Sequence, residues 1–243
     1  MKVFEIARLA LAPALPPLAY RVRRDLKSLV GPLGRALRLL DVGARNSPYT
    51  IGLPVRVTLL DVPRKNEIQT AYNLGVEERD WAERIRKRRS NVEAQFVQDF
   101  TRNSLPSASF DVVTSVEVIE HVEKDEDFVR EVARVLKPEG FAYLTTPNGD
   151  AIPVPSPQHV RHYRRTQLDA LCRRFFQDVS ITYAIRLDRW HRLGHRGYSL
   201  DRPIRTLLTI GANILQKLTD ANDEVRMECT AHLIAVCRGP QNS

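Results

Sequence analysis

The stretch Leu37-Arg38-Leu39-Leu40-Asp41-Val42-Gly43 decides the fold class, because it is a short apolar run that ends in an acid and a glycine. Two comparable runs follow it: residues 55–60 lead to Asp61, and residues 94–98 lead to Asp99. Such short runs are typical of buried strands in a parallel sheet. Ligands bind outside the carboxyl ends of these strands, where the three carboxylates are expected. Because a carboxylate accepts hydrogen bonds from ribose hydroxyls or an adenine amino group, we expect an adenosine-containing cofactor.

Strand and helix patterns alternate along the rest of the chain, which predicts a doubly wound α/β fold with a seven-stranded, mostly parallel sheet. Further strands are expected at residues 110–115, 141–146, 179–183 and 231–237, and amphipathic helices at 20–30, 125–136 and 166–176.

The domain organisation is expected to be an N-terminal helical segment, residues 1–36, followed by one domain, residues 37–243. Insertions are expected at 64–91 and at 184–230, and the second carries a possible helix at 203–218. That helix is a candidate substrate lid, dimer surface or lipid-facing helix, and the alternative is a helix packed on its own domain.

Composition favours anionic partners, since 37 Lys and Arg against 29 Asp and Glu give a net charge of +8. Phosphorylated metabolites, lipid headgroups and nucleic acid all fit, and so does a merely solvated basic surface, which is the expectation for residues 84–89. The three cysteines form no Cys-x-x-Cys pair and are expected to be reduced, buried thiols of a cytoplasmic protein. Residues 1–20 are too short and too interrupted by proline to span a bilayer, and make a poor secretory signal.

The loop after the first strand separates two cofactor classes. A dinucleotide fold favours Gly-x-Gly-x-x-Gly there, so that the backbone can approach a pyrophosphate. Only Gly43 is present, followed by Ala44, Arg45 and Asn46. A cofactor without a pyrophosphate is therefore favoured over the nicotinamide cofactor of a dehydrogenase.

Motifs in a fixed order continue from that loop through the rest of the sheet. They are Leu40–Gly43, Asp61, Asp99-Phe100, Leu105-Pro106, Ser109–Val113, Val116–Val122, Arg134–Gly140 and Thr146–Asn148. In this combination residues 39–176 resemble the class I S-adenosylmethionine-dependent methyltransferases of the type 11/23 kind, and are similar to the ubiquinone-biosynthesis O-methyltransferases. The resemblance implies S-adenosyl-L-methionine as cofactor.

The resemblance also implies the cofactor-binding residues, which are Asp41, Gly43, Ala44, Arg45, Asp61, Asp99, Phe100, Ser115 and Val116. By this resemblance Asp61 accepts the ribose hydroxyls and Asp99 accepts the adenine amino group. The alternative for both acids is a turn at the end of a strand. Arg45 stands where the family has a second glycine; it either points outward or reaches an anionic group, and a domain that no longer binds the cofactor is a further alternative.

The candidate catalytic residues are His121, Glu117 and His162. His121 is the expected general base, since its pKa lies near working pH, and the alternative is a histidine that caps a turn. Glu117, Glu120 and His121 are spaced i, i+3, i+4, so a helical turn would present them to one divalent cation, with His159 or His162 as a further ligand. Similar turns occur in small-RNA 2′-O-methyltransferases and in relatives without a metal, and no metal ligand is assigned.

The acceptor is expected to be a small molecule or glycan, anionic or rich in hydroxyls, because residues 159–165 and Arg173-Arg174 gather cations near the presumed acceptor pocket. O-methylation is the favoured reaction. The alternative reaction is 2′-O-methylation of an RNA 3′ end. The low aromatic content and the lack of a recognised RNA-binding module disfavour it. The third hypothesis is a non-catalytic regulator that binds S-adenosylmethionine. Peripheral membrane contact is an open possibility. The sequence leaves the acceptor and the oligomeric state undetermined.

Overall fold

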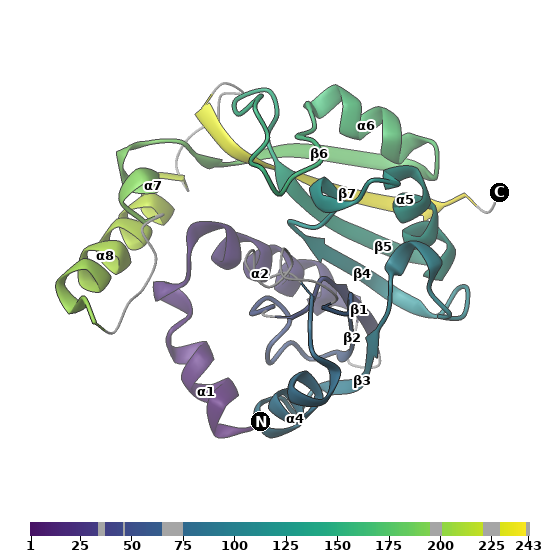
Figure 1. Ribbon diagram of the computed structural model, residues 1–243, viewed down its shortest axis with the longest axis horizontal. Coiled ribbons are helices and arrows are strands. Elements are labelled where there is room, and N and C mark those ends of the chain that lie inside the picture. Colours follow the sequence, from purple (N-terminus) through teal and green to yellow (C-terminus); the bar gives the residue numbers. More distant parts are fainter. Residues whose placement is uncertain (34–36, 46, 65–74, 195–200, 221–228, 242–243) are drawn as a thin grey trace.

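The computed structural model describes residues 1–33, 37–45, 47–64, 75–194, 201–220 and 229–241. Its centre is a seven-stranded sheet in the order β3-β2-β1-β4-β5-β7-β6 (Figure 1). The strands are β1 (Arg38–Val42), β2 (Arg56–Asp61), β3 (Val92–Val97), β4 (Phe110–Val116), β5 (Leu136–Pro147), β6 (Phe176–Arg186) and β7 (Thr230–Pro240). Only β7 runs antiparallel to its neighbours β5 and β6. The predicted doubly wound, mostly parallel α/β fold is confirmed.

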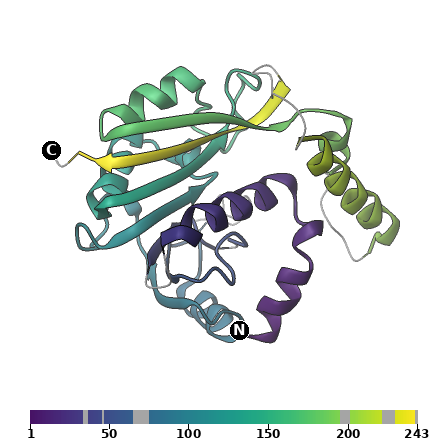
Figure 2. The same cartoon turned by 180° about the vertical axis from the view of Figure 1, so that it is seen from behind.

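Helices cover both faces of this sheet. The helices are α1 (Val3–Ala10), α2 (Pro17–Val30), α4 (Glu78–Arg88), α5 (Asp125–Val135), α6 (Arg165–Arg173), α7 (Arg189–Gly194) and α8 (Pro203–Asp220), and the short 3-10 turns are η1 (Ala12–Ala14), η2 (Gly31–Leu33), η3 (Phe100–Arg102) and η4 (Ile119–His121). The side chains of α2 and α4 enter one hydrophobic core, and those of α5 and α6 enter the other. The sheet is therefore the middle layer of three, as the two opposite views show (Figures 1 and 2).

The α5 helix illustrates how the sequence builds a layer. Its first turn carries three acids, which favour the positive end of a helix dipole. Phe128, Val129, Val132 and Val135 follow at helical spacing and are all buried against the sheet. The predicted helix at 125–136 is thus confirmed, with its end one residue earlier, because Leu136 already pairs with Phe110 in the sheet.

Both predicted insertions contain helices. In the first, α4 occupies Glu78–Arg88, and residues 65–74 lie outside the described residues. In the second, α7 and α8 precede β7, which confirms the predicted helix at 203–218, and residues 195–200 and 221–228 lie outside the described residues. None of the helices within the described ranges is both long and apolar enough to cross a membrane.

Two sequence expectations about individual side chains are wrong. The run 84–89 is not uniformly solvated, because Arg89 is buried at the end of α4 and donates a hydrogen bond to Thr50 Oγ1 at 2.9 Å. The cysteines are not all buried: Cys172 and Cys237 lie in the core, whereas Cys229 is exposed just before β7. Arg89 and Cys229 both lie just outside a regular element, where helical or strand periodicity no longer predicts whether a side chain is buried.

Candidate functional site

A cavity of about 750 Å³ opens at the carboxyl ends of β1, β2 and β4. Its lining combines the loop after β1, the ends of β2 and β4, and the segments that carry η3 and η4; among the expected site residues it includes Gly43, Arg45, Asp61, Asp99, Phe100, Val116, Glu117 and His121. Parallel α/β sheets bind ligands at this edge, and the volume suits a nucleoside-sized molecule.

Gly43 is the residue that lets the loop after β1 pass close to the turn after β4. Its φ is +76°, a conformation that other residues rarely adopt. A Cβ atom at this position would lie 2.4 Å from Cγ2 of Val118. The backbone amide of Gly43 donates to the carbonyl oxygen of Leu60 at 2.9 Å, so the loop is held against β2 as well.

Asp61 combines the two roles that the sequence left open. Its carboxylate accepts the backbone N–H of Arg45 at 2.8 Å and that of Val62 at 2.8 Å, and so it holds the loop after β1. The same side chain lines the cavity, and each oxygen retains a further lone pair. Burial raises the pKa of Asp61, while the two backbone hydrogen bonds oppose this shift.

Asp99 also holds a turn. One carboxylate oxygen accepts the backbone N–H of Thr101 at 2.9 Å and its hydroxyl at 2.8 Å, which caps η3. Both Asp99 and the adjacent Phe100 line the cavity, and the Phe100 ring packs edge-on against Phe128 with the centroids 5.2 Å apart. The turn and the cavity wall are thus built from the same residues.

Three of the expected cofactor residues, Asp41, Ala44 and Ser115, lie behind the cavity lining rather than in it. Asp41 is buried, and one of its oxygens accepts hydrogen bonds from the hydroxyls of Ser47 at 2.6 Å and Thr50 at 2.8 Å. Burial raises the pKa of Asp41, and the Ser47 hydrogen bond and the Arg89 charge oppose it. Ala44 belongs to the core on the α2 side, and Ser115 is buried in β4 between β1 and β5. These residues support the site without facing the cavity.

Glu117 follows β4 in a left-handed conformation, with φ at +57°. Its backbone amide donates to the carbonyl of Thr145, and its carboxylate accepts the Thr145 hydroxyl at 2.9 Å and lies 3.1 Å from Nδ1 of His232. Burial raises the pKa of Glu117, but the His232 imidazole and the Thr145 hydroxyl outweigh burial and the pKa is lowered overall. The expectation that Glu117 shares a helical turn with Glu120 and His121 is wrong, because η4 begins only at Ile119.

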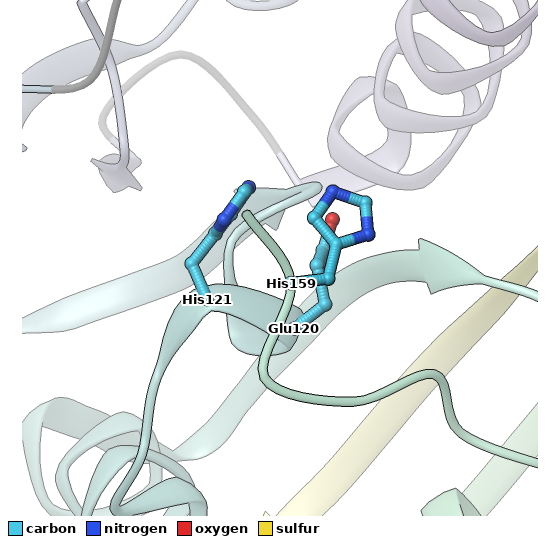
Figure 3. A group of neighbouring side chains, drawn as sticks. All are labelled: Glu120, His121 and His159. Carbon is cyan, nitrogen blue, oxygen red and sulfur yellow. The ribbon is translucent and has the colours of Figure 1, made fainter. Parts of the chain in front are cut away.

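A compact cluster forms instead from Glu120, His121 and His159, where one ligand atom from each lies within 4.8 Å of the others (Figure 3). Glu120 and His121 come from η4, and His159 comes from the loop between β5 and α6. The backbone N–H of Val160 donates to the carbonyl of Glu120 at 2.7 Å, and this bond draws the loop onto η4.

Hydrogen bonds assign the protons of the three histidines. Nδ1 of His162 lies 2.7 Å from the carbonyl oxygen of Ile152, which only accepts, so this nitrogen carries the proton. Nε2 of a neutral His162 then accepts from Nδ1 of His159 at 2.7 Å. Nδ1 of His121 likewise donates to the carbonyl of Gln158 at 2.8 Å. The neutral rings of His121 and His159 thus keep the lone pair on Nε2, whereas both nitrogens of His162 are engaged.

Glu120 is buried within the cluster and accepts the Thr146 hydroxyl at 3.2 Å through one oxygen, while its second oxygen has no hydrogen-bond partner among the residues that the structure describes. Burial and, after it, the charge of Glu117 raise the pKa of Glu120 well above the ordinary glutamate value. A carboxylate and two imidazole nitrogens are a donor set that a divalent transition metal accepts. The same arrangement leaves His121 able to take a proton at the cavity wall.

The cationic lining of the cavity differs from the sequence expectation. Three arginines expected near the acceptor form ion pairs: Arg161 with Asp125 at 2.8 Å, Arg173 with Asp169 at 2.7 Å, and Arg174 with Glu126. The basic residues of the lining are instead Arg45, Arg102 and Lys124. Ser47 and Tyr49 also line the cavity and were missed, although both follow the Gly43 loop directly.

Comparison with known proteins relates this fold and site to methyltransferases. Residues 40–144 match the methyltransferase domain family. A probable S-adenosylmethionine-dependent methyltransferase of Mycobacterium tuberculosis is 41% identical over 73 residues, which are 28% of this chain and 26% of that protein. A ubiquinone biosynthesis O-methyltransferase of Rickettsia bellii is 28% identical over 115 residues, which are 46% of this chain and 42% of that protein. The matches span less than half the length of these relatives.

Solved structures show the same fold over most of the chain. Phosphoethanolamine N-methyltransferase 2 of Haemonchus contortus superposes with a TM-score of 0.61 at 17% identity, over 98% of this chain and 58% of that one. The YcgJ protein of Bacillus subtilis superposes with a TM-score of 0.55 at 18% identity, over 90% of this chain and 98% of that one. These two structures share the fold of this chain, and the match to the methyltransferase domain family covers residues 40–144.

Proposed function

We propose that this chain catalyses transfer of a methyl group from S-adenosylmethionine to a hydroxyl oxygen of a small-molecule or glycan acceptor. The observation that carries the proposal is that Asp61, Asp99 and His121 line one cavity at the carboxyl edge of the sheet. The two acids line the same cavity as the imidazole, and the neutral imidazole, with Nδ1 bonded to the Gln158 carbonyl, would offer Nε2 as a proton acceptor.

The cofactor brings a methyl group already activated on a sulfonium sulfur. Asp61 would hold the ribose hydroxyls and Asp99 the adenine amino group, while the loop at Gly43 would leave room for the methionine part. What remains for the chain is to align the acceptor and to take its proton. Nε2 of His121 would receive the hydroxyl proton as the acceptor oxygen takes the methyl group, which the cofactor would supply with a neutral thioether as the leaving group.

Three basic side chains of the lining, Arg45, Arg102 and Lys124, favour an acceptor that carries a phosphate or carboxylate group. The O-methyltransferase name of the Rickettsia relative agrees with a hydroxyl acceptor, although the match covers under half of either protein.

The test is isothermal titration of the chain with S-adenosylmethionine and S-adenosylhomocysteine, followed by untargeted mass spectrometry of cell extract incubated with enzyme and cofactor. We expect binding of both compounds and an extract component that gains CH₂ on oxygen. Binding without any methylated product would support a non-catalytic S-adenosylmethionine-binding regulator, and absence of binding would overturn the proposal.

The cluster of Glu120, His121 and His159 favours a second candidate, metal-dependent 2′-O-methylation of an RNA 3′ end. A divalent cation held there would polarise an acceptor hydroxyl and neutralise the buried Glu120 carboxylate. Turnover on small RNA that EDTA abolishes and Mn²⁺ or Mg²⁺ restores would favour this candidate. Turnover on a small molecule that is unchanged by EDTA would exclude it.

A further inference from the structure

The polarity of α8 is inverted relative to that of an ordinary surface helix. Thr209, Asn213 and Gln216 are buried, and Nε2 of Gln216 donates to the carbonyl of Arg186 at 2.7 Å. The aliphatic side chains point outward instead; the exposed ones are Ile204, Leu207, Leu208, Ile214, Leu215 and Leu218. Ile204 is 75% exposed and Leu218 is 61% exposed, whereas Gln216 is 0% exposed. Surface helices normally bury their apolar stripe, so this face lacks a covering partner among the described residues.

The α1 helix shows the same inversion. Its only buried residue is Glu5, whose carboxylate accepts the backbone N–H of Ser90 at 3.0 Å and its hydroxyl at 2.7 Å. Val3 and Ile6 are exposed on the outside of the helix, at 83% and 57%. Both views place α1 and α8 on the same side of the molecule, opposite the C-terminal end of β7 (Figures 1 and 2). The α8 helix packs against η1, which directly follows α1, so the two helices are linked through this turn.

Cations border these apolar faces. On the α8 side the exposed cation is Arg202, just before the helix, whereas Arg205 is only partly exposed and Lys217 is half-buried with its Nζ 4.8 Å from the Tyr20 ring centroid. Beside α1, the C-terminal half of α4 presents exposed Arg84, Arg86, Lys87 and Arg88, of which Lys87 pairs with Glu83 at 2.6 Å. The α1 and α4 helices are in contact, since the Arg88 guanidinium lies 5.1 Å from the Phe4 ring centroid and Nζ of Lys2, just before α1, donates to the Arg86 carbonyl.

We propose that α1 and α8 form a docking surface for an anionic lipid membrane. Aliphatic side chains on the outer face of a helix, bordered by Lys and Arg, are the features that place a helix in the plane of a membrane interface. Anionic headgroups attract the bordering cations, while the leucines and isoleucines enter the acyl boundary. A second copy of the chain fits less well, because a symmetric interface would bring the same cations of two copies together.

The proposal concerns a surface outside the methyltransferase cavity, since α1 and α8 contribute no residue to its lining. Membrane docking and methyl transfer are therefore separable by experiment. A variant that loses lipid binding keeps its affinity for S-adenosylmethionine, and failure of either proposal leaves the other intact.

The test is co-sedimentation of the full chain with vesicles of phosphatidylcholine, with and without phosphatidylglycerol. We expect partitioning onto the phosphatidylglycerol vesicles that weakens as NaCl is raised, and at least tenfold weaker partitioning for the double variant Leu207→Gln/Leu208→Gln. The control is Val154→Gln, which replaces a 77% exposed apolar side chain in the loop between β5 and α6, and it is expected to leave partitioning unchanged.

Folding of each variant is checked by thermal melting and by titration with S-adenosylmethionine, and its oligomeric state by light scattering. Both leucines are exposed, so the double variant is expected to melt like the wild type. The proposal is overturned if the wild type stays in the supernatant with anionic vesicles, or if the double variant sediments like the wild type. A wild-type dimer that the double variant converts to a monomer, with equal lipid binding, would assign the surface to a second copy instead.

Discussion

His159 donates from Nδ1 to Nε2 of His162 at 2.7 Å, and this contact orients the imidazole that faces Glu120 and His121. His162 was a candidate catalytic residue, yet both of its nitrogens are engaged, one with His159 and one with the Ile152 carbonyl. We therefore assign His162 the role of orienting His159, and we expect His159 instead of His162 to act directly in the site.

Replacing His162 tests that role. Since residues behind a catalytic or metal-binding histidine typically contribute 10–100-fold, His162→Phe is expected to lower kcat by about that factor. The KM and Kd for S-adenosylmethionine should stay unchanged. His162→Gln, whose amide oxygen can accept from His159, should recover part of kcat. Equal loss in both variants would contradict a role through the accepted hydrogen bond.

His121 is predicted to take the acceptor proton. His121→Asn should reduce kcat by about 10²–10⁴-fold, the usual contribution of a general base, because no group of suitable basicity replaces it. Single-turnover kinetics measures the effect, with titration of S-adenosylmethionine as the control for an intact cofactor site. A variant with wild-type turnover would show that the proton leaves by another route.

Asp61 is predicted to bind the ribose hydroxyls. Hydrogen bonds to a charged group contribute about 1.5–3 kcal/mol each, so Asp61→Ala should raise the Kd for S-adenosylmethionine by at least about tenfold. Asp61→Asn keeps an acceptor oxygen for only one of the two backbone amides, and its Kd should lie between those of the wild type and Asp61→Ala. The control is Asp178→Asn, an exposed carboxylate on β6 that pairs with Arg238. An unchanged Kd for Asp61→Ala in calorimetry would remove Asp61 from the cofactor site.

Arg89 is predicted to stabilise the fold through the buried Asp41. Thr50 links the two side chains, since its hydroxyl donates to Asp41 and accepts from Arg89. Removing one partner of a buried charge pair typically costs 3–5 kcal/mol, so Arg89→Met should lower the free energy of unfolding by about 3 kcal/mol in urea denaturation. Arg86→Met, on the exposed side of α4, is the control. Adding Asp41→Asn to Arg89→Met should recover part of the loss; no recovery would mean that the two charges are not coupled.

The lowered pKa of Glu5 predicts that the stability of the fold depends on pH. Burial raises its pKa, but the hydrogen bonds from the Ser90 amide and hydroxyl outweigh burial, and the pKa lies below the ordinary value of 4.5. A carboxylate with a lowered folded-state pKa contributes stability above its unfolded pKa and loses it as the pH falls through the folded one. The Tm difference between wild type and Glu5→Gln should therefore be present at neutral pH and shrink below 4.5. A difference that grows in acid would contradict this assignment.

The sequence by itself determined the strands, the amphipathic helices and the carboxyl edge at which Gly43, Asp61 and Asp99 meet. These features follow from local periodicity, from backbone geometry and from the rule that parallel strands end at a common edge. Only the tertiary structure decided that Asp41 faces Ser47 and Thr50 instead of the cavity, that His159 and not His162 joins Glu120 and His121, and that α8 buries its polar face. Each of these three orientations depends on which side of a helix, strand or loop meets a segment distant along the chain. Tertiary packing decides this, and the residue pattern of the element alone does not.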